Sequence, residues 1–121
     1  MMAAPKSWRV RLAAAAEADF RNILAWTSDN FGARQARTYS ATLSLALREL
    51  TRGPIKSGTT PRNDIGRGIY ALHVARHGRK GRHFVVFRVG RDPGGETIDV
   101  LRLLHDAMDL PRHVPAEGEA R

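Results

Sequence analysis

The sequence predicts an α+β fold, in which an N-terminal strand and an antiparallel helical hairpin pack on a small antiparallel β-sheet. Two segments, 13–31 and 33–50, carry apolar residues at helical spacing. Shorter segments before and after them are rich in β-branched and aromatic residues. The length of 121 residues suits one core, so we expect 1–121 to be a single domain whose folded part spans 8–114.

The N-terminal half is expected to hold one strand and both helices. Residues 8–12 alternate between apolar side chains and arginines, which is typical of a half-buried strand. The first helix covers 13–31 and ends at Gly32, a residue suited to a helix C-terminus. The second helix covers 33–50 and ends before a Gly-Pro pair, because proline cannot continue a helix. The short gap between the helices permits only an antiparallel hairpin.

The C-terminal half is expected to form the sheet. A Gly- and Pro-containing loop at 52–68 leads to a strand at 69–75, and a basic turn at 77–82 leads to the next strand. Strands at 83–89 and 97–104 are joined by an Asp-Pro-Gly-Gly turn. After them we expect a short helix or a polar tail, with the helix N-terminus capped by an aspartate.

The helical stripes and the strand alternation converge on one hydrophobic core. We expect that core to contain Phe20, Leu24, Leu43, Leu47, Phe87 and Leu103. Alternate strand residues face opposite sides of a sheet, so Val86 and Arg88 share one face, as do Val100 and Arg102. If the helices cover the other face, these four side chains are exposed together. Such a face suits a protein partner or an anionic ligand.

Charge is concentrated in the middle of the chain. The net charge is +8, and residues 52–91 hold ten lysines and arginines against a single acid, Asp64. This block favours a polyanion or an acidic protein as partner. Composition alone does not choose between the two, so direct binding of nucleic acid stays an open alternative.

Several classes of protein are disfavoured. The chain has no cysteine, no apolar run long enough to span a membrane and no hydrophobic signal core. We therefore expect a cytoplasmic protein. No spacing of His, Asp or Glu is typical of a metal site, and no glycine loop is placed to hold phosphate, so neither a metal nor a cofactor is predicted.

The C-terminal segment VLRLLHDAMDLPRHVP carries a family resemblance. Its pairs Leu104-His105, Met108-Asp109 and Arg112-His113 resemble the end of ParE-type toxins, in the ParE/RelE superfamily of bacterial toxin–antitoxin modules. In the helical hairpin, Phe31-Gly32 and Gln35-Ala36 followed by Tyr39 match the same family. The resemblance covers 8–114, and only the link at 77–83 is longer than is usual there.

The resemblance implies the toxin of a type II toxin–antitoxin system. Such a toxin inhibits DNA gyrase by binding, arrests growth, and is neutralised by a cognate ParD-like antitoxin in a hetero-oligomer. In that case the chain is a binder and not an enzyme. The partner-binding residues we expect are Val86, Arg88, Val100, Arg102, His105, Met108, Asp109 and Arg112.

The main alternative is a RelE-like, ribosome-dependent mRNA endonuclease that needs no metal. Arg88 and Arg102 would then hold the phosphate and His105 would transfer the proton. We rank it second because Tyr39 and Tyr70 are not expected near the tail, and because the tail carries the Leu-His-x-x-Met-Asp pattern that resembles the ParE branch. A structural role for His105 at a strand end is at least as good an interpretation as a functional one. A non-toxic nucleic-acid-binding module is a third class, favoured by charge alone.

Overall fold

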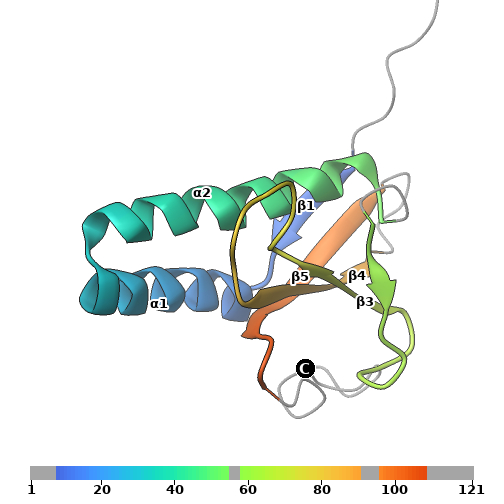
Figure 1. The fold of residues 1–121 in the computed structure, drawn as a ribbon. Helices are drawn as coiled ribbons and strands as arrows, with labels where there is room; N and C mark the ends of the chain where they lie inside the picture. Colours follow the sequence, from blue (N-terminus) through green and yellow to red (C-terminus); the bar gives the residue numbers. More distant parts are fainter. Residues whose placement is uncertain (1–7, 55–57, 91–95, 109–121) are drawn as a thin grey trace, which may run out of the picture.

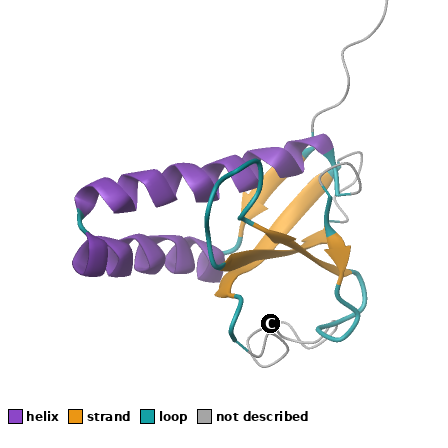
Figure 2. Ribbon diagram, in the orientation of Figure 1, coloured by secondary structure: helices purple, strands orange, loops and turns teal. Residues whose placement is uncertain are grey.

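A computed structural model describes residues 8–54, 58–90 and 96–108 of the chain. Two antiparallel helices form one layer and a five-stranded sheet forms the other (Figures 1 and 2). The helical hairpin reaches beyond the edge of the sheet (Figure 1). The elements are β1 (Arg9–Leu12), α1 (Ala14–Phe31), α2 (Ala33–Glu49), the 3-10 helix η1 (Leu50–Arg52), β2 (Thr60–Pro61), β3 (Ile69–His73), β4 (His83–Val89) and β5 (Thr97–His105).

The helices match their predicted spans closely. Gly32 separates them with a φ of 94°, a conformation that glycine adopts without the strain caused by a Cβ. Its N–H donates to the carbonyl of Ser28 at 2.9 Å and so closes α1. Within the described part of the chain, no helix is long and apolar enough to cross a membrane.

The sheet is mixed, where the sequence predicted only antiparallel pairs. Its order is β1-β5-β4-β3-β2, and β2 to β5 pair antiparallel as expected. β1 pairs with β5 in parallel, with Arg9 opposite Thr97. A parallel pair needs a crossover between its strands, and here that crossover contains both helices and three strands. The two-residue strand β2 also lies within the segment expected to be an irregular loop.

The predicted core is confirmed. Leu43, Phe87 and Leu103 are buried in the main cluster between the helices and the sheet. Phe20, Leu24 and Leu47 are partly buried and pack against it. Helical and strand periodicity therefore identified the apolar layer correctly.

The expected exposure of Val86 and Val100 is wrong, since both side chains are fully buried. The pairing of β4 with β5 shifts between Val86 and Phe87, so that Leu101 is an extra residue in β5. This bulge reverses the alternation and turns Val100 into the main core.

The second face of the sheet is also covered. Val86 lies there in a smaller cluster with Ile65, Ile69 and Leu104. The segment before β3 supplies Ile65, so the aliphatic face predicted to be open is closed by the chain itself. Neither valine is available to a partner in this structure.

Candidate functional site

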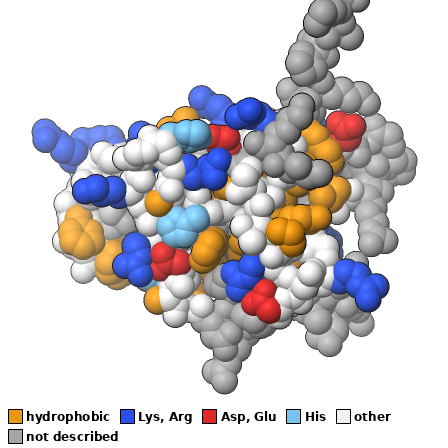
Figure 3. All heavy atoms as spheres, turned by 45° about the vertical axis from the view of Figure 1, so that its right-hand side comes forward, with side chains coloured by type: hydrophobic (Ala, Val, Ile, Leu, Met, Phe, Trp, Pro, Cys, Tyr) orange, Lys and Arg blue, Asp and Glu red, His pale blue; other side chains and the backbone are white. Residues whose placement is uncertain are grey.

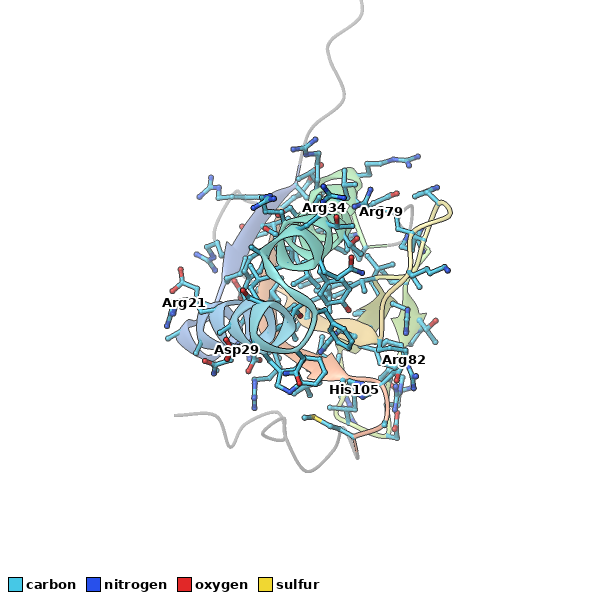
Figure 4. The ribbon with its side chains drawn as sticks, turned by 60° about the vertical axis from the view of Figure 1, so that its left-hand side comes forward. Arg21, Asp29, Arg34, Arg79, Arg82 and His105 are labelled. Atoms are coloured by element: carbon cyan, nitrogen blue, oxygen red, sulfur yellow. The ribbon has the colours of Figure 1, made fainter. Side chains whose placement is uncertain are left out.

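A groove with a volume of about 740 Å³ lies between α1, the start of α2 and the end of β5. We call it the hairpin groove. Its apolar wall includes Ile23, Trp26, Phe31, Leu103 and Met108, and its polar wall includes Asp19, Tyr39, Lys80, Arg82, His83, Arg102 and His105. Figure 4 views the hairpin from its tip and shows Arg82 and His105 close together on one side of it.

Exposed apolar side chains gather at this groove. Trp26 is 60% exposed, Phe31 65% and Met108 44%. The rings of Trp26 and Phe31 meet edge to face with centroids 5.7 Å apart. Of the five large apolar side chains that are exposed in the described residues, these three line the groove. Clustered apolar exposure of this kind marks surfaces that bind other proteins.

Tyr39 joins α2 to the residues that precede β4. The backbone N–H of Arg82 donates to the Tyr39 hydroxyl at 3.0 Å, and that hydroxyl lies 2.6 Å from Nδ1 of His83. Gly81 is required beside them, because a Cβ there would lie 2.5 Å from Val74 and 3.0 Å from the Tyr39 hydroxyl. The glycine thus lets the chain approach α2 closely enough for both hydrogen bonds.

His83 and His105 are opposite each other on β4 and β5, with ring centroids 5.3 Å apart. Burial, and then the neighbouring His105, lower the pKa of His83 to about 4. His83 is therefore neutral at pH 7, and its Nδ1 shares a hydrogen bond with the Tyr39 hydroxyl whose direction is set by the tautomer of the ring. Nδ1 of His105 accepts the backbone N–H of Ala107 at 3.1 Å, which is the structural role anticipated for it.

Asp106 binds two basic residues in place of capping a helix. Arg82 Nη2 lies 2.9 Å from its carboxylate, and His73 Nε2 lies 2.9 Å from it. The hydrogen bond from Arg82, and then that from His73, hold the pKa of Asp106 well below its usual range. Asp106 thereby ties β3, the segment before β4 and the end of β5 together.

Arg102 is held by α1. Its Nε and Nη2 atoms donate to the carboxylate of Asp19 at 2.7 and 2.9 Å, and the backbone N–H of Leu103 donates to the same group at 2.9 Å. This role of Asp19 is not among those predicted from the sequence. The sequence does contain a sign of it, because Asp19 is an acidic residue at the i+3 position of the apolar stripe that starts at Ala16. A carboxylate on a buried helical face needs a partner.

Replacing Asp19 with alanine is expected to lower the free energy of unfolding by about 2–3 kcal/mol. That is less than the ~3–5 kcal/mol of a fully buried pair, since Arg102 keeps some contact with water. Urea unfolding measures this loss of stability. Asp29→Ala is the control, because Asp29 is exposed on the same helix (Figure 4). Equal stabilities for the two variants would contradict the role given to Asp19.

Acid is expected to destabilise the fold through His83. An unfolded histidine has a pKa of about 6.5. Between that pH and about 4 the unfolded chain binds a proton that folded His83 does not, so stability falls as pH drops through this window. Urea unfolding at about pH 7 and about pH 5 should show a smaller loss of stability for His83→Gln than for the unmodified chain. An NMR titration midpoint of His83 near 6.5 would refute the prediction.

The three residues proposed for a nuclease do not form one site. Arg102 and His105 line the hairpin groove, but Arg88 lies about 16 Å along β4 from His83. Nε of Arg88 lies 3.9 Å from the carboxylate of Asp99. Two of the three residues therefore lie at one groove, and Arg88 is not part of it.

The expected position of Tyr39 is also wrong, because its hydroxyl lies beside His83 and hence near the start of the tail. Met108 lines the groove, and its role as a partner contact stays a prediction. Asp109 and Arg112 lie outside the described residues. Among residues 8–54, 58–90 and 96–108, no group of three His, Asp or Glu side chains is placed to hold a metal ion.

Comparison with known proteins agrees with this architecture. The family model described as the ParE toxin of a type II toxin–antitoxin system, parDE, matches residues 10–110. The chain is 36% identical over 99 residues to Toxin ParE of Escherichia coli, covering 82% of this chain and 85% of that protein. It is 35% identical over 109 residues to Toxin ParE1 of Mycobacterium tuberculosis, covering 89% and 99%.

Solved structures share the fold at lower identity. The chromosomal ParDE system of P. aeruginosa matches with a TM-score of 0.66 and 18% identity, covering 84% of this chain and 98% of that one. The RelBE2 toxin–antitoxin complex of Mycobacterium tuberculosis matches with a TM-score of 0.54 and 22% identity, covering 84% and 94%. Because the family model matches residues 10–110 of the 121 in this chain, the chain belongs to the ParE toxins of type II toxin–antitoxin systems.

Proposed function

We propose that this ParE toxin acts in the cytoplasm, where it inhibits DNA gyrase by binding, and that a cognate ParD-like antitoxin neutralises it. The observation that carries the proposal is the hairpin groove, with Trp26, Phe31 and Met108 exposed around it. Its aromatic and thioether side chains are the types that dominate protein interfaces. The family membership supplies the class of partner, and the groove supplies a surface that fits one.

The antitoxin segment we envisage is amphipathic. Its apolar side chains contact Trp26, Phe31 and Met108, and its acidic side chains face Lys80 and His105, which line the same groove. This differs from the contact first expected, since Val86 and Val100 are buried and take no part. Such a pairing resembles the docking of an amphipathic helix in an apolar groove.

Other contact residues follow from the position of the groove. His105 and Met108 lie at its rim, and Asp109 and Arg112 follow directly in the sequence, so we keep all four as proposed partner contacts. Arg88 lies elsewhere on the sheet, and we keep it as a proposed partner contact outside the groove. Arg102 also lines the groove, where Asp19 holds its position, and we keep it as a proposed partner contact.

A supercoiling assay tests the proposal. Purified toxin is added to gyrase, ATP and relaxed plasmid, and inhibition is expected in proportion to toxin. A molar excess of antitoxin should restore supercoiling. A chain ending at Met108 keeps the contacts of Asp106 but lacks Asp109 and Arg112, so we expect it to lose inhibition while retaining its melting temperature. Unimpaired supercoiling at saturating full-length toxin would reject gyrase as the target.

A RelE-like mRNA endonuclease is the second candidate, and one observation favours it. Tyr39, His83 and His105 lie together in a groove that also presents Arg82. These groups are of the types that transfer protons and stabilise phosphate in metal-free RNA cleavage. Against it, Arg82 is paired with Asp106, and Nδ1 of His83 is already hydrogen-bonded to the Tyr39 hydroxyl.

Translation-coupled RNA cleavage separates the two candidates. A nuclease that uses His105 for proton transfer should lose about 100-fold or more of its activity in His105→Gln. A gyrase inhibitor should keep most of its activity in the same variant, because glutamine preserves size and a hydrogen-bonding group. Codon-specific mRNA cuts that vanish in His105→Gln would replace the gyrase proposal with the nuclease.

A further inference from the structure

A second hollow, with a volume of about 470 Å³, lies on the far half of α2 from the hairpin tip. Its other wall is the link between β3 and β4, residues 74–82, which lies against α2 (Figure 1). We call it the basic hollow. Its charged lining residues are Arg48, Glu49, Arg52, Arg76, His77 and Arg79. None of the described residues lines both this hollow and the hairpin groove.

The link is fixed on α2 by its own side chains. Nε of Arg79 donates to the Thr42 hydroxyl at 2.8 Å, and its Nη2 donates to the carbonyl of Thr38 at 3.1 Å. His77 Nε2 hydrogen-bonds the carboxylate of Glu49. The length of this link, which sequence analysis left unexplained, is what allows it to reach α2 and form a wall.

Cations exceed anions in the hollow. Four arginines and the single carboxylate of Glu49 line the hollow, and Glu49 hydrogen-bonds His77 and lies 3.7 Å from Arg52. Nε of Arg76 is buried and has no hydrogen-bond partner among the residues that the structure describes. A buried donor without an acceptor is costly, and an anionic oxygen in the hollow would satisfy it. Figure 3 shows more basic than acidic side chains over this side of the molecule.

The lining favours phosphate over a protein surface. Guanidinium groups match the oxygens of a phosphate in a two-point contact. An acidic protein would need apolar anchors to bind tightly, and among the described residues Leu45 is the one exposed large apolar side chain in the hollow. No aromatic ring among the described lining residues is present to stack on a base.

We propose that the basic hollow binds the phosphate backbone of a nucleic acid without reading its sequence. The site is separate from the hairpin groove, so nucleic acid and antitoxin are able to bind at the same time. The proposed binding of nucleic acid is additional to the inhibition of gyrase, and it does not require that gyrase be the target. A toxin that carries such a site would be held near the DNA on which its proposed target works.

Fluorescence anisotropy with a short labelled DNA duplex tests the proposal on the full chain. We expect affinity to fall steeply with salt, as it does when phosphates are neutralised. The double variant Arg48→Gln with Arg52→Gln should bind about 10-fold more weakly and lower the salt slope by about 2. Both side chains are exposed, so the fold should tolerate the change. Arg76→Gln, which removes the unsatisfied donor, should weaken binding as well.

The matched control is Arg21→Gln with Arg34→Gln, which removes the same charge from other exposed positions (Figure 4). Arg34 lies about 20 Å along α2 from Arg48. The control should keep binding within about 2-fold. Equal losses in both double variants would mean that net charge, and not the hollow, holds DNA. Absence of binding, or tighter binding of a poly-glutamate peptide to the same arginines, would also overturn the proposal.

Discussion

Replacing Trp26 and Phe31 together with alanine is expected to weaken antitoxin binding by about 100- to 1,000-fold. Each ring is more than half exposed in the free chain and lines the hairpin groove. Truncating an aromatic residue at the centre of an interface typically costs about 1.5–2 kcal/mol of binding free energy, so the pair loses about 3–4 kcal/mol, which corresponds to this range. Both side chains are largely in water, so the variant should keep its melting temperature.

Isothermal titration with the cognate antitoxin measures the effect. The control is Leu45→Ala with Val89→Ala, which truncates two exposed apolar side chains that do not line the groove. It should bind the antitoxin as the unmodified chain does. An unchanged affinity for the Trp26 and Phe31 variant would show that the antitoxin binds another face, even if gyrase inhibition is confirmed.

The second large effect concerns the core. Phe87→Ala is expected to lower the free energy of unfolding by about 3–5 kcal/mol, because the cavity it leaves adds to the lost burial. Phe87 is fully buried and stacks on Tyr70, with ring centroids 5.6 Å apart. A loss of this size is a large fraction of the ~5–15 kcal/mol that stabilises a typical domain.

Chemical unfolding compares this variant with Val89→Ala, which truncates an exposed side chain of the same strand. The control is expected to change stability by less than about 1 kcal/mol. If the two variants unfold at the same denaturant concentration, Phe87 does not hold the central place in the core that its burial indicates.

Much of the fold follows from local patterns. A helical stripe involves neighbours three and four residues apart, and a strand involves alternate residues, so each is encoded within a few turns of chain. That is why α1, α2, β4 and β5 lie where the sequence predicts them. The same patterns identified the core residues Leu43 and Phe87.

The predicted exposure of Val86 and Val100 was wrong because it depended on features outside the local pattern, the first of which is the register of β5 on β4. The bulge in β5 places Leu101 between two paired residues and moves Val100 into the core. No local composition marks that insertion. Burial of Val86 likewise depends on Ile65, which comes from a segment that the sequence indicates only as a loop.

What the sequence determined by itself is the order and type of the main elements, the concentration of positive charge in the middle block, and the residue pairs that resemble ParE toxins. What only the tertiary structure decided is which distant side chains meet. Tyr39 contacts His83 across 44 positions, and Asp19 contacts Arg102 across 83. Such contacts depend on how α1 and α2 pack on the sheet, and periodicity along a single element contains no information about its neighbour in space. The hairpin groove and the basic hollow both arise from that packing.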